Sequence, residues 1–187
     1  MKKNETLMVS ISGIRGVFGS GLDASSIVRY SAAFGTWCHQ RANARKERPL
    51  VVIGRDARAT GKICAQLVAA TLQAAGCDVL DLDLATTPTV AMAVLREKAV
   101  GGVVLSASHN PAEWNALKLL GAGGEFLRAH EAQDVIAIAD KQAHHTVAYN
   151  QIGTYEASQY LFKHIRAILD LDFVDSTAIA QRQFKVV

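Results

Sequence analysis

The chain has 187 residues, of which 50% are hydrophobic and 20% are charged, and its formal net charge is +3. This length and composition are typical of one globular domain, and no apolar run approaches the ~20 residues that span a bilayer. The basic start of the chain continues into Asn4, Glu5 and Thr6 instead of a long apolar region, so it does not resemble a secretory signal. We therefore expect a soluble, cytoplasmic protein without a membrane partner.

The cysteines and the densest basic cluster both favour ordinary structural roles. Cys38, Cys64 and Cys77 show no C-x-x-C spacing and stand in apolar or helical contexts, which predicts reduced core residues. The basic cluster comprises Arg41, Arg45, Lys46 and Arg48. Because no aromatic side chains are interleaved with these cations, we expect a solvated helix end and no nucleic-acid partner.

The predicted elements begin with a strand over residues 7–11, followed by a glycine-dense loop, SGIRGVFGSG, over residues 12–21. Asp23 is a good N-cap, and apolar residues follow it at helical spacing, so a helix should begin there and end before Pro49. This segment is expected to bury one face against a sheet.

A second strand, LVVIGRD over residues 50–56, has the β-branched composition of a strand that is buried on both faces. It breaks at its glycine and leaves Arg55 and Asp56 at its carboxyl end. The next helix is predicted to be capped by Thr60 and to end at Gly76 in a left-handed conformation.

The alternation continues with a third strand over residues 77–84. Thr87 and Pro88 suggest an N-cap and a first helical position, which predicts a helix over residues 90–98, and VGGVVLSAS over residues 100–108 is a fourth strand. Strands and helices in strict alternation predict an α/β domain with a largely parallel sheet and right-handed crossovers.

The last third of the chain is predicted to be mainly helical. Helices are expected over residues 130–143 and 158–169, and FKVV at residues 184–187 has the composition of a strand that has only begun. We therefore expect the natural chain to continue beyond this point.

Reactive and cationic side chains follow three of the predicted strands. Arg15 lies in SGIRG after the first strand, Arg55 lies in GRD after the second, and Ser108 and His109 lie in SASHNP after the fourth. Since the carboxyl ends of parallel strands meet at one edge of a sheet, these residues are expected to surround a single crevice.

Ser108 is a better candidate for a phosphoserine than for a hydrolase nucleophile. The G-x-S-x-G elbow is absent, and His109 is adjacent in sequence and so cannot easily activate Ser108 as a triad base. A phosphoryl group needs cations and donors nearby, which Arg15, His109 and Lys118 could supply. The Asn110-Pro111 turn is predicted to present Ser108 at its tip.

Other chemistries have weaker support in the sequence. GSGLDA, residues 19–24, matches the dinucleotide pattern, but no strand is predicted to run directly into it and no acidic residue follows at the required distance. The P-loop pattern is missing, and the histidines show no metal-ligand spacing with carboxylates or cysteines.

The motifs SGIRG, GRD, TPT and SASHNP, in this order and followed by N-x-L-K, resemble the N-terminal domain of the α-D-phosphohexomutases. The resemblance implies that Ser108 is the phosphoserine that donates and accepts the phosphoryl group and helps to bind Mg²⁺. It implies that Arg15 and Lys118 contact this group and, with His109 beside them, are candidates for general acid and base work. It makes Asn110, Arg55 and Asp56 candidates for binding phosphate or substrate.

The family reaction moves phosphate between C1 and C6 of a hexose through a hexose 1,6-bisphosphate intermediate. The resemblance implies a three-layer α/β/α domain with a mixed, mostly parallel four-stranded sheet, in which residues 115–120 form an antiparallel edge strand. Residues 1–183 would form this domain, and residues 184–187 would begin a second one.

Family members also contain a D-G-D-G-D metal loop, a sugar-reading loop and a further phosphate loop in C-terminal domains, and none of these motifs occurs in this chain. We therefore expect this piece to lack mutase turnover. Two alternatives stay open: a phosphoglucosamine mutase domain, and a module that binds a phosphosugar without chemistry.

Overall fold

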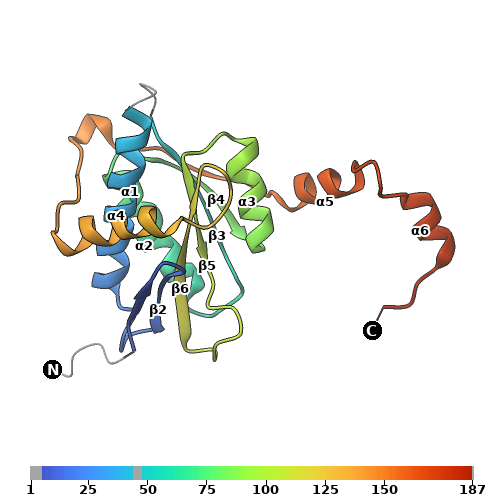
Figure 1. Ribbon diagram of the computed structural model, residues 1–187, viewed down its shortest axis with the longest axis horizontal. Helices are drawn as coiled ribbons and strands as arrows, with labels where there is room; N and C mark the ends of the chain where they lie inside the picture. Colours follow the sequence, from blue (N-terminus) through green and yellow to red (C-terminus); the bar gives the residue numbers. More distant parts are fainter. Residues whose placement is uncertain (1–5, 44–47, 187) are drawn as a thin grey trace.

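The described part of the chain, residues 6–43 and 48–186 of a computed structural model, forms a mixed sheet of seven strands with helices on both faces (Figure 1). The strands are β1 (Met8–Ser10), β2 (Gly13–Val17), β3 (Leu50–Arg55), β4 (Asp78–Leu84), β5 (Gly101–Leu105), β6 (Trp114–Gly121) and β7 (Tyr155–Ala157). The helices are α1 (Ala24–Asn43), α2 (Gly61–Ala74), α3 (Thr87–Arg96), α4 (Ala129–Asp140), η1 (Tyr149–Gln151), α5 (Leu161–Leu169) and α6 (Ser176–Arg182). The predicted α/β class is confirmed.

The sheet has the strand order β1-β2-β6-β5-β3-β4-β7. Strands β5, β3, β4 and β7 are paired in parallel, whereas β6, β2 and β1 extend the sheet by successive antiparallel pairs. The prediction of a mostly parallel sheet of four strands is therefore wrong, since the sheet has seven strands and three of its six strand pairs are antiparallel. The family-based expectation that residues 115–120 form the edge is also wrong, because β2 pairs with the free side of β6.

The SGIRG segment was predicted to be a loop because of its two glycines, whereas the structure forms strand β2 there. Its glycines serve close approach of the backbone: a Cβ at Gly16 would lie 2.8 Å from the Leu22 nitrogen and 3.2 Å from the Gly21 carbonyl carbon. Strand β7, with three exposed residues, has no hydrophobic alternation that could have predicted it.

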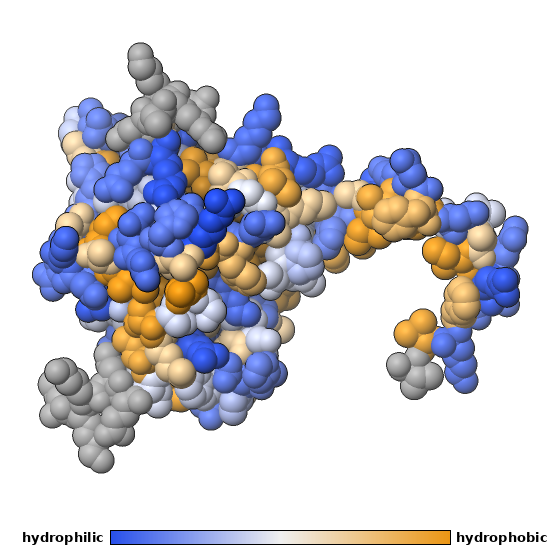
Figure 2. Space-filling view, in the orientation of Figure 1, coloured by the Kyte–Doolittle hydropathy of each residue, from blue (hydrophilic) through white to orange (hydrophobic). Residues whose placement is uncertain are grey.

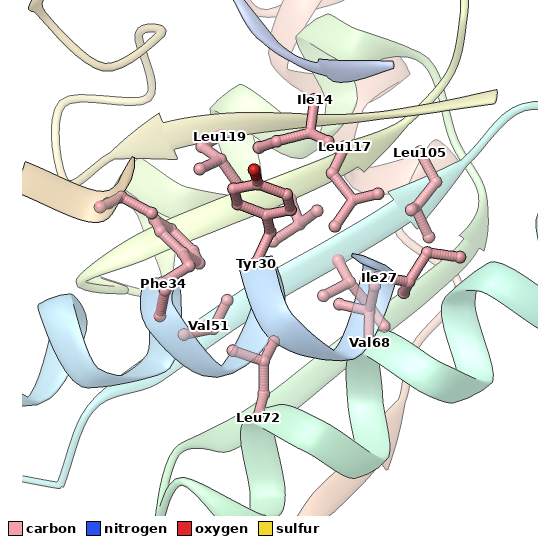
Figure 3. Packing of buried hydrophobic residues seen from close by; sticks show 14 of the residues in the cluster. Ile14, Ile27, Tyr30, Phe34, Val51, Val68, Leu72, Leu105, Leu117 and Leu119 are labelled. Carbon is pink, nitrogen blue, oxygen red and sulfur yellow. The ribbon is translucent and has the colours of Figure 1, made fainter. Parts of the chain in front are cut away.

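Two hydrophobic clusters hold helices to the opposite faces of the sheet. On one face, Ile14, Leu105 and Leu117 pack with side chains of α1, α2 and α4 (Figure 3). On the other face, Val104 and Leu120 pack with side chains of α3. The three layers follow from this alternation, because successive strand residues point to opposite faces.

Trp37 is the largest fully buried side chain of the core and lies in α1. Its ring stacks on Phe34 with a centroid separation of 5.6 Å, and the Arg41 guanidinium carbon lies 3.5 Å from its ring centroid. Arg41 lies in the last turn of α1, as expected, but its guanidinium packs on the Trp37 ring, which the prediction of a solvated helix end did not include. Arg45 and Lys46 of the same predicted cluster lie outside the described residues.

The helix boundaries follow the predicted signals with two exceptions. The Asp23 carboxylate accepts the Ser26 backbone N–H at 2.7 Å, and Gly76 has a φ of +82°, as expected of an N-cap and a left-handed helix end. The cap of α3 is Thr86, not Thr87, because the Thr86 hydroxyl accepts the N–H of Thr89. Thr60 precedes α2 without a side-chain cap bond.

Helices α5 and α6 extend away from the layered body (Figure 1). The Tyr160 hydroxyl anchors their start by donating to the Glu97 carboxylate at 2.8 Å. Apolar side chains gather along the extension and are exposed (Figure 2): they include Leu161, Phe162, Ile165, Ile168, Leu169, Phe173 and Phe184. Residues 184–186 form no strand, Val187 lies outside the described residues, and the division into residues 1–183 and 184–187 stays a prediction.

The three cysteines are buried and free, as predicted. Burial raises the pKa of the Cys64 thiol to about 11 and that of Cys77 to about 12, and it raises the pKa of Cys38 as well. No helix in the described ranges is long and apolar enough to cross a membrane.

Candidate functional site

Five of the predicted site residues, Asn110 among them, meet in one cavity of about 210 Å³ at the end of β5. Arg15 comes from β2, Lys118 comes from β6, and Ser108 and His109 come from the turn between β5 and β6. The cavity is lined by Ser12, Gly13, Arg15, Ala107, Ser108, His109, Asn110, Ala116 and Lys118. Residues that are more than ninety positions apart in the sequence therefore line the same small space.

Sheet register places the two cations on the same face. Arg15 lies opposite Ala116 in the pairing of β2 with β6, and Lys118 lies opposite Val104 in the pairing of β6 with β5. Cross-strand partners share a face, and so do residues two apart along a strand. Arg15 and Lys118 thus flank Ala116 on the face to which Val104 also points.

Small residues hollow out the cavity between these cations. Gly13, Ala107 and Ala116 line it with little or no side chain, so the backbone forms its floor. Gly13 has a φ of +118° and lies close to the neighbouring strand, since a Cβ there would stand 3.3 Å from the Leu117 carbonyl carbon and closer still to its oxygen. The cavity therefore requires glycine at this position.

Ser108 lies at the tip of a tight turn and is exposed. The Asn110 N–H donates to the Ala107 carbonyl at 3.1 Å, which closes a four-residue turn with Ser108 at its first central position. Ser108 has a φ of +56°, and His109 is not among the residues with positive φ, as in a type II′ turn. Glycine is the usual residue at this position, so the serine is held in a costly conformation.

The cavity offers donors and positive charge. The Arg15 Nε is buried and has no hydrogen-bond partner among the described residues, and Lys118 is half-buried. No carboxylate is among the described residues that line the cavity. Since an unpaired buried donor is costly, this lining fits an anion such as a phosphoryl group on Ser108.

Arg55 and Asp56 lie outside this cavity. The Arg55 Nε donates to Asp83 at 2.8 Å, and its side chain lines a different cavity beside Tyr155. The Asp56 carboxylate accepts the Arg58 backbone N–H and its Nε, each at 3.1 Å. The predicted phosphate contacts of these two residues therefore stay predictions, with both side chains engaged by other groups here.

Sequence reasoning missed Arg58. Its guanidinium donates to the backbone carbonyls of Ser108, Asn110, Pro111 and Trp114. These partners lie 50 to 56 positions away and are main-chain atoms, so no spacing of residue types predicts them. The only available signal was local, the Asp-x-Arg spacing at the end of β3.

The side chains that line the cavity do not provide a metal site without additional ligands. The cationic side chains of Arg15 and Lys118 would repel a divalent cation, and no group of three or more His, Cys, Asp or Glu side chains is found within the described ranges. A magnesium ion near Ser108 would need a phosphate oxygen and carboxylates from elsewhere.

The GSGLDA segment does have a strand close before it, because β2 ends at Val17, contrary to the sequence prediction. The dinucleotide context is nevertheless missing. Strands β2 and β3, on either side of α1, are separated in the sheet by β6 and β5 and form no βαβ unit of neighbours.

A larger cavity, of about 470 Å³, lies between the start of α1 and the segment after α4, lined by residues such as Val28, Arg29 and His144. It contains none of the predicted residues. We place the site at the smaller cavity, because Arg15, Lys118 and the turn that carries Ser108 meet there.

Fold and site together define an α/β domain with an exposed serine beside a cavity lined by an arginine and a lysine at the end of its sheet. Residues 7–146 match the model of the phosphoglucomutase/phosphomannomutase alpha/beta/alpha domain I. The chain belongs to this family.

Individual relatives agree with this assignment. A phosphoglucomutase/phosphomannomutase of Thermococcus kodakarensis is 34% identical over 175 residues, which cover 94% of this chain and 37% of that protein. A phosphoglucosamine mutase of Frankia alni is 39% identical over 135 residues, which cover 70% of this chain and 30% of that protein. This chain thus spans about a third of the length of such relatives.

Solved structures show the same fold. The crystal structure of a phosphoglucomutase/phosphomannomutase family protein from Burkholderia thailandensis aligns with a TM-score of 0.70 and 27% sequence identity. The alignment covers 87% of this chain and 36% of that one.

Proposed function

We propose that this chain is the phosphoserine-bearing part of a phosphohexomutase, an enzyme that interconverts hexose 1-phosphate and hexose 6-phosphate. The observation that carries the proposal is the placement of Ser108 in one cavity with Arg15, Lys118 and His109. Family membership and relatives named as such mutases support it.

In the proposed reaction, Ser108 carries the phosphoryl group between half-reactions. A sugar hydroxyl oxygen attacks the phosphorus of phospho-Ser108, the bond between phosphorus and Oγ breaks, and a hexose 1,6-bisphosphate forms. The hydroxyl proton passes to a base, and the Ser108 oxygen takes up a proton as it leaves. In the second half-reaction the other phosphoryl group of the bisphosphate returns to Ser108 by the reverse of these steps.

The residues of the cavity supply position and charge for this transfer. Arg15 and Lys118 hold the phosphoryl oxygens, and His109 and Lys118 are the candidates for proton transfer beside Oγ. The Asn110 side chain is committed to the turn, since its Nδ2 donates to the Ala107 carbonyl at 2.8 Å. Phosphoryl transfer depends mainly on such positioning and on cations around the transferring group.

We infer that Mg²⁺ assists this chemistry in the whole protein by neutralising charge on the transferring group. From this chain it would receive a phosphate oxygen on Ser108, and its carboxylate ligands would come from C-terminal domains. Those domains are also the proposed partners that bind the phosphohexose and exclude water, because a mutase that admitted water would lose its phosphoryl group.

The test is to incubate the chain with glucose 1,6-bisphosphate and to measure its intact mass. We expect a gain of one phosphoryl group, which peptide mapping places on Ser108 and which Ser108→Ala abolishes. Ser25→Ala, an exposed serine in the first turn of α1, is the control and should be labelled like the parent chain. Equal labelling of Ser108→Ala contradicts the proposal.

A second assay measures interconversion of glucose 1-phosphate and glucose 6-phosphate. We expect no interconversion by this chain alone, because an open cavity on one domain cannot retain the bisphosphate while that intermediate reorients between the half-reactions. Detectable interconversion contradicts this part of the proposal.

A binding module without chemistry is the competing function, and the orphaned Arg15 Nε favours it equally. The two functions predict different behaviour of Ser108. A module binds inorganic phosphate with or without the serine and never accepts a phosphoryl group, whereas the mutase fragment becomes covalently labelled.

Within the mutase class, phosphoglucosamine mutase is the alternative, since one relative described above bears that name. The test is to mix the phosphorylated chain with glucose 1-phosphate, mannose 1-phosphate or glucosamine 1-phosphate in turn. Mass spectrometry then follows the loss of the phosphoryl group and shows which sugar accepts it.

A further inference from the structure

The Arg58 side chain reaches from the end of β3 into the turn that carries Ser108. We propose that Arg58, held in place by Asp56, is the positioning residue that fixes the Ser108 backbone. The inference rests on the proposed function for its catalytic consequence, but the positioning itself is measurable without any phosphoryl transfer.

Every N–H of the Arg58 guanidinium has an acceptor. One terminal nitrogen donates to the carbonyls of Pro111 and Trp114, and the other donates to those of Ser108 at 2.9 Å and Asn110 at 2.8 Å. The Nε donates to the Asp56 carboxylate at 3.1 Å. Since a guanidinium has five N–H donors, none is left to bind phosphate.

Hydrogen bonds from two sources fix the two peptide groups that flank Ser108. Its N–H donates to the Ser106 hydroxyl at 3.1 Å, and its carbonyl accepts from Arg58. A serine with a φ of +56° persists only where the surroundings over-determine it. Arg58 holds the peptide group on the carbonyl side of Ser108. We therefore expect it to fix the direction in which the Ser108 side chain points.

Asp56 orients the arginine from the other side. Its two carboxylate oxygens accept the Arg58 backbone N–H and its Nε, which fixes both ends of the side chain. The Arg58 side chain is 12% exposed and that of Asp56 is 29% exposed, so this pair is shielded from water far more than a surface ion pair. Asp56 therefore acts through Arg58.

Two further bonds join the same segments. The Asp56 N–H donates to the Leu105 carbonyl at 3.0 Å, and the buried Asn115 side chain donates to the Thr60 hydroxyl at 3.0 Å. The loop after β3 and the turn after β5 thus form one unit, with Arg58 at its centre.

Lysine cannot replace this arrangement, because an ammonium lacks the planar fork that reaches carbonyls on both sides. The test compares Arg58→Lys and Asp56→Asn with the parent chain by amide hydrogen exchange of residues 107–110. Arg166→Lys is the control, since Arg166 is 78% exposed and pairs only with Asp170 in the described part of the chain.

We expect both test variants to accelerate exchange at the Ser108 and Asn110 amides at least tenfold, while amides in the core of α1 and the melting temperature change little. The Arg166→Lys control should leave exchange in the turn unchanged. Unchanged exchange in Arg58→Lys overturns the proposal, and so does acceleration spread evenly over the whole molecule, which indicates a merely structural role.

A second measurement follows labelling of Ser108 by glucose 1,6-bisphosphate. We expect Arg58→Lys to lower the maximal labelling rate at least tenfold without changing the donor concentration at half-maximal rate, because Arg58 does not line the cavity. A change in half-maximal concentration alone overturns the positioning role. If the parent chain is never labelled, the proposed function fails, while the exchange data still decide whether Arg58 fixes the turn.

Discussion

Replacing Gly13 by alanine tests whether the cavity beside Ser108 depends on the absence of a side chain. Gly13 combines two constraints, a φ of +118° and close approach to the Leu117 carbonyl group. Other glycines separate these constraints. Gly19 has a φ of +88°, but no atom of the described residues lies within 4 Å of the place a Cβ would take. Gly123 has neither a positive φ nor such a neighbour within the described ranges.

The geometry sets the expected order of effects. An L-residue in the strained region costs about 1–3 kcal/mol, and overlap with fixed backbone costs about 1–3 kcal/mol more. Reduced freedom of the unfolded chain returns about 0.4–1 kcal/mol. We therefore expect Gly13→Ala to lose about 1–5 kcal/mol, Gly19→Ala to lose about 0–2.5 kcal/mol, and Gly123→Ala to be neutral or slightly stabilising.

Equilibrium urea unfolding of the three variants, followed by circular dichroism, measures these differences. Binding of inorganic phosphate measures the local effect, because relief of the overlap must move β6 and with it Lys118. Gly13→Ala should therefore weaken phosphate binding more than Gly19→Ala does. A loss of stability in Gly13→Ala no larger than in Gly19→Ala would refute the reasoning about backbone contact.

Three further predictions concern the helix cap, the thiols and the core. Hydrogen bonds from Ser26 hold the pKa of Asp23 below its usual value, so its contribution is complete above about pH 4 and is lost as the pH falls through the folded-state pKa. Asp23→Asn should keep the cap at neutral pH, and its melting temperature should fall less on acidification than that of the parent chain. Asp23→Ala should lower the free energy of unfolding by about 1 kcal/mol at neutral pH. An equally steep fall of the melting temperature with acid in Asp23→Asn contradicts this prediction. Because the thiols of Cys38, Cys64 and Cys77 are buried with raised pKa values, a disulfide reagent at neutral pH should label them only after unfolding, and rapid labelling of the native chain would show that the core opens. Leu105→Ala, at a fully buried position, should cost about 2–5 kcal/mol in urea unfolding, and a loss below about 1 kcal/mol would mean that the site collapses around the change.

The sequence predicted the central part of the fold because its signals there are local. Strands β3 and β5 are short runs of mainly apolar residues, and β4 ends in alternating Asp and Leu. Each helix between them begins or ends at a marked residue such as Gly76. Of the outer strands, β1 lies within the predicted residues 7–11, whereas β2 and β7 were missed. Strand β7 has three exposed residues and no hydrophobic alternation, and β2 contains glycines that serve close packing but resemble a loop.

The grouping of the site residues followed from sheet geometry, although one premise was wrong. Arg15 was placed in a loop at a strand end, whereas it lies within β2 and reaches the cavity through its register with Ala116. Arg58 could not be predicted at all, since its partners are carbonyl groups of a distant turn. Interactions of side chains with remote backbone leave no pattern in the residue types.

The two tryptophans lie in places where their fluorescence should respond to different structural changes. Trp37 is 1% exposed in the middle of α1, so its emission should change only when the whole core opens. Trp114 stands at the start of β6, and its carbonyl accepts from Arg58, so its emission should respond when the turn around Ser108 loosens. A Trp114→Phe variant, which keeps Trp37, would therefore report global unfolding. A Trp37→Phe variant, which keeps Trp114, would report local motion of the turn.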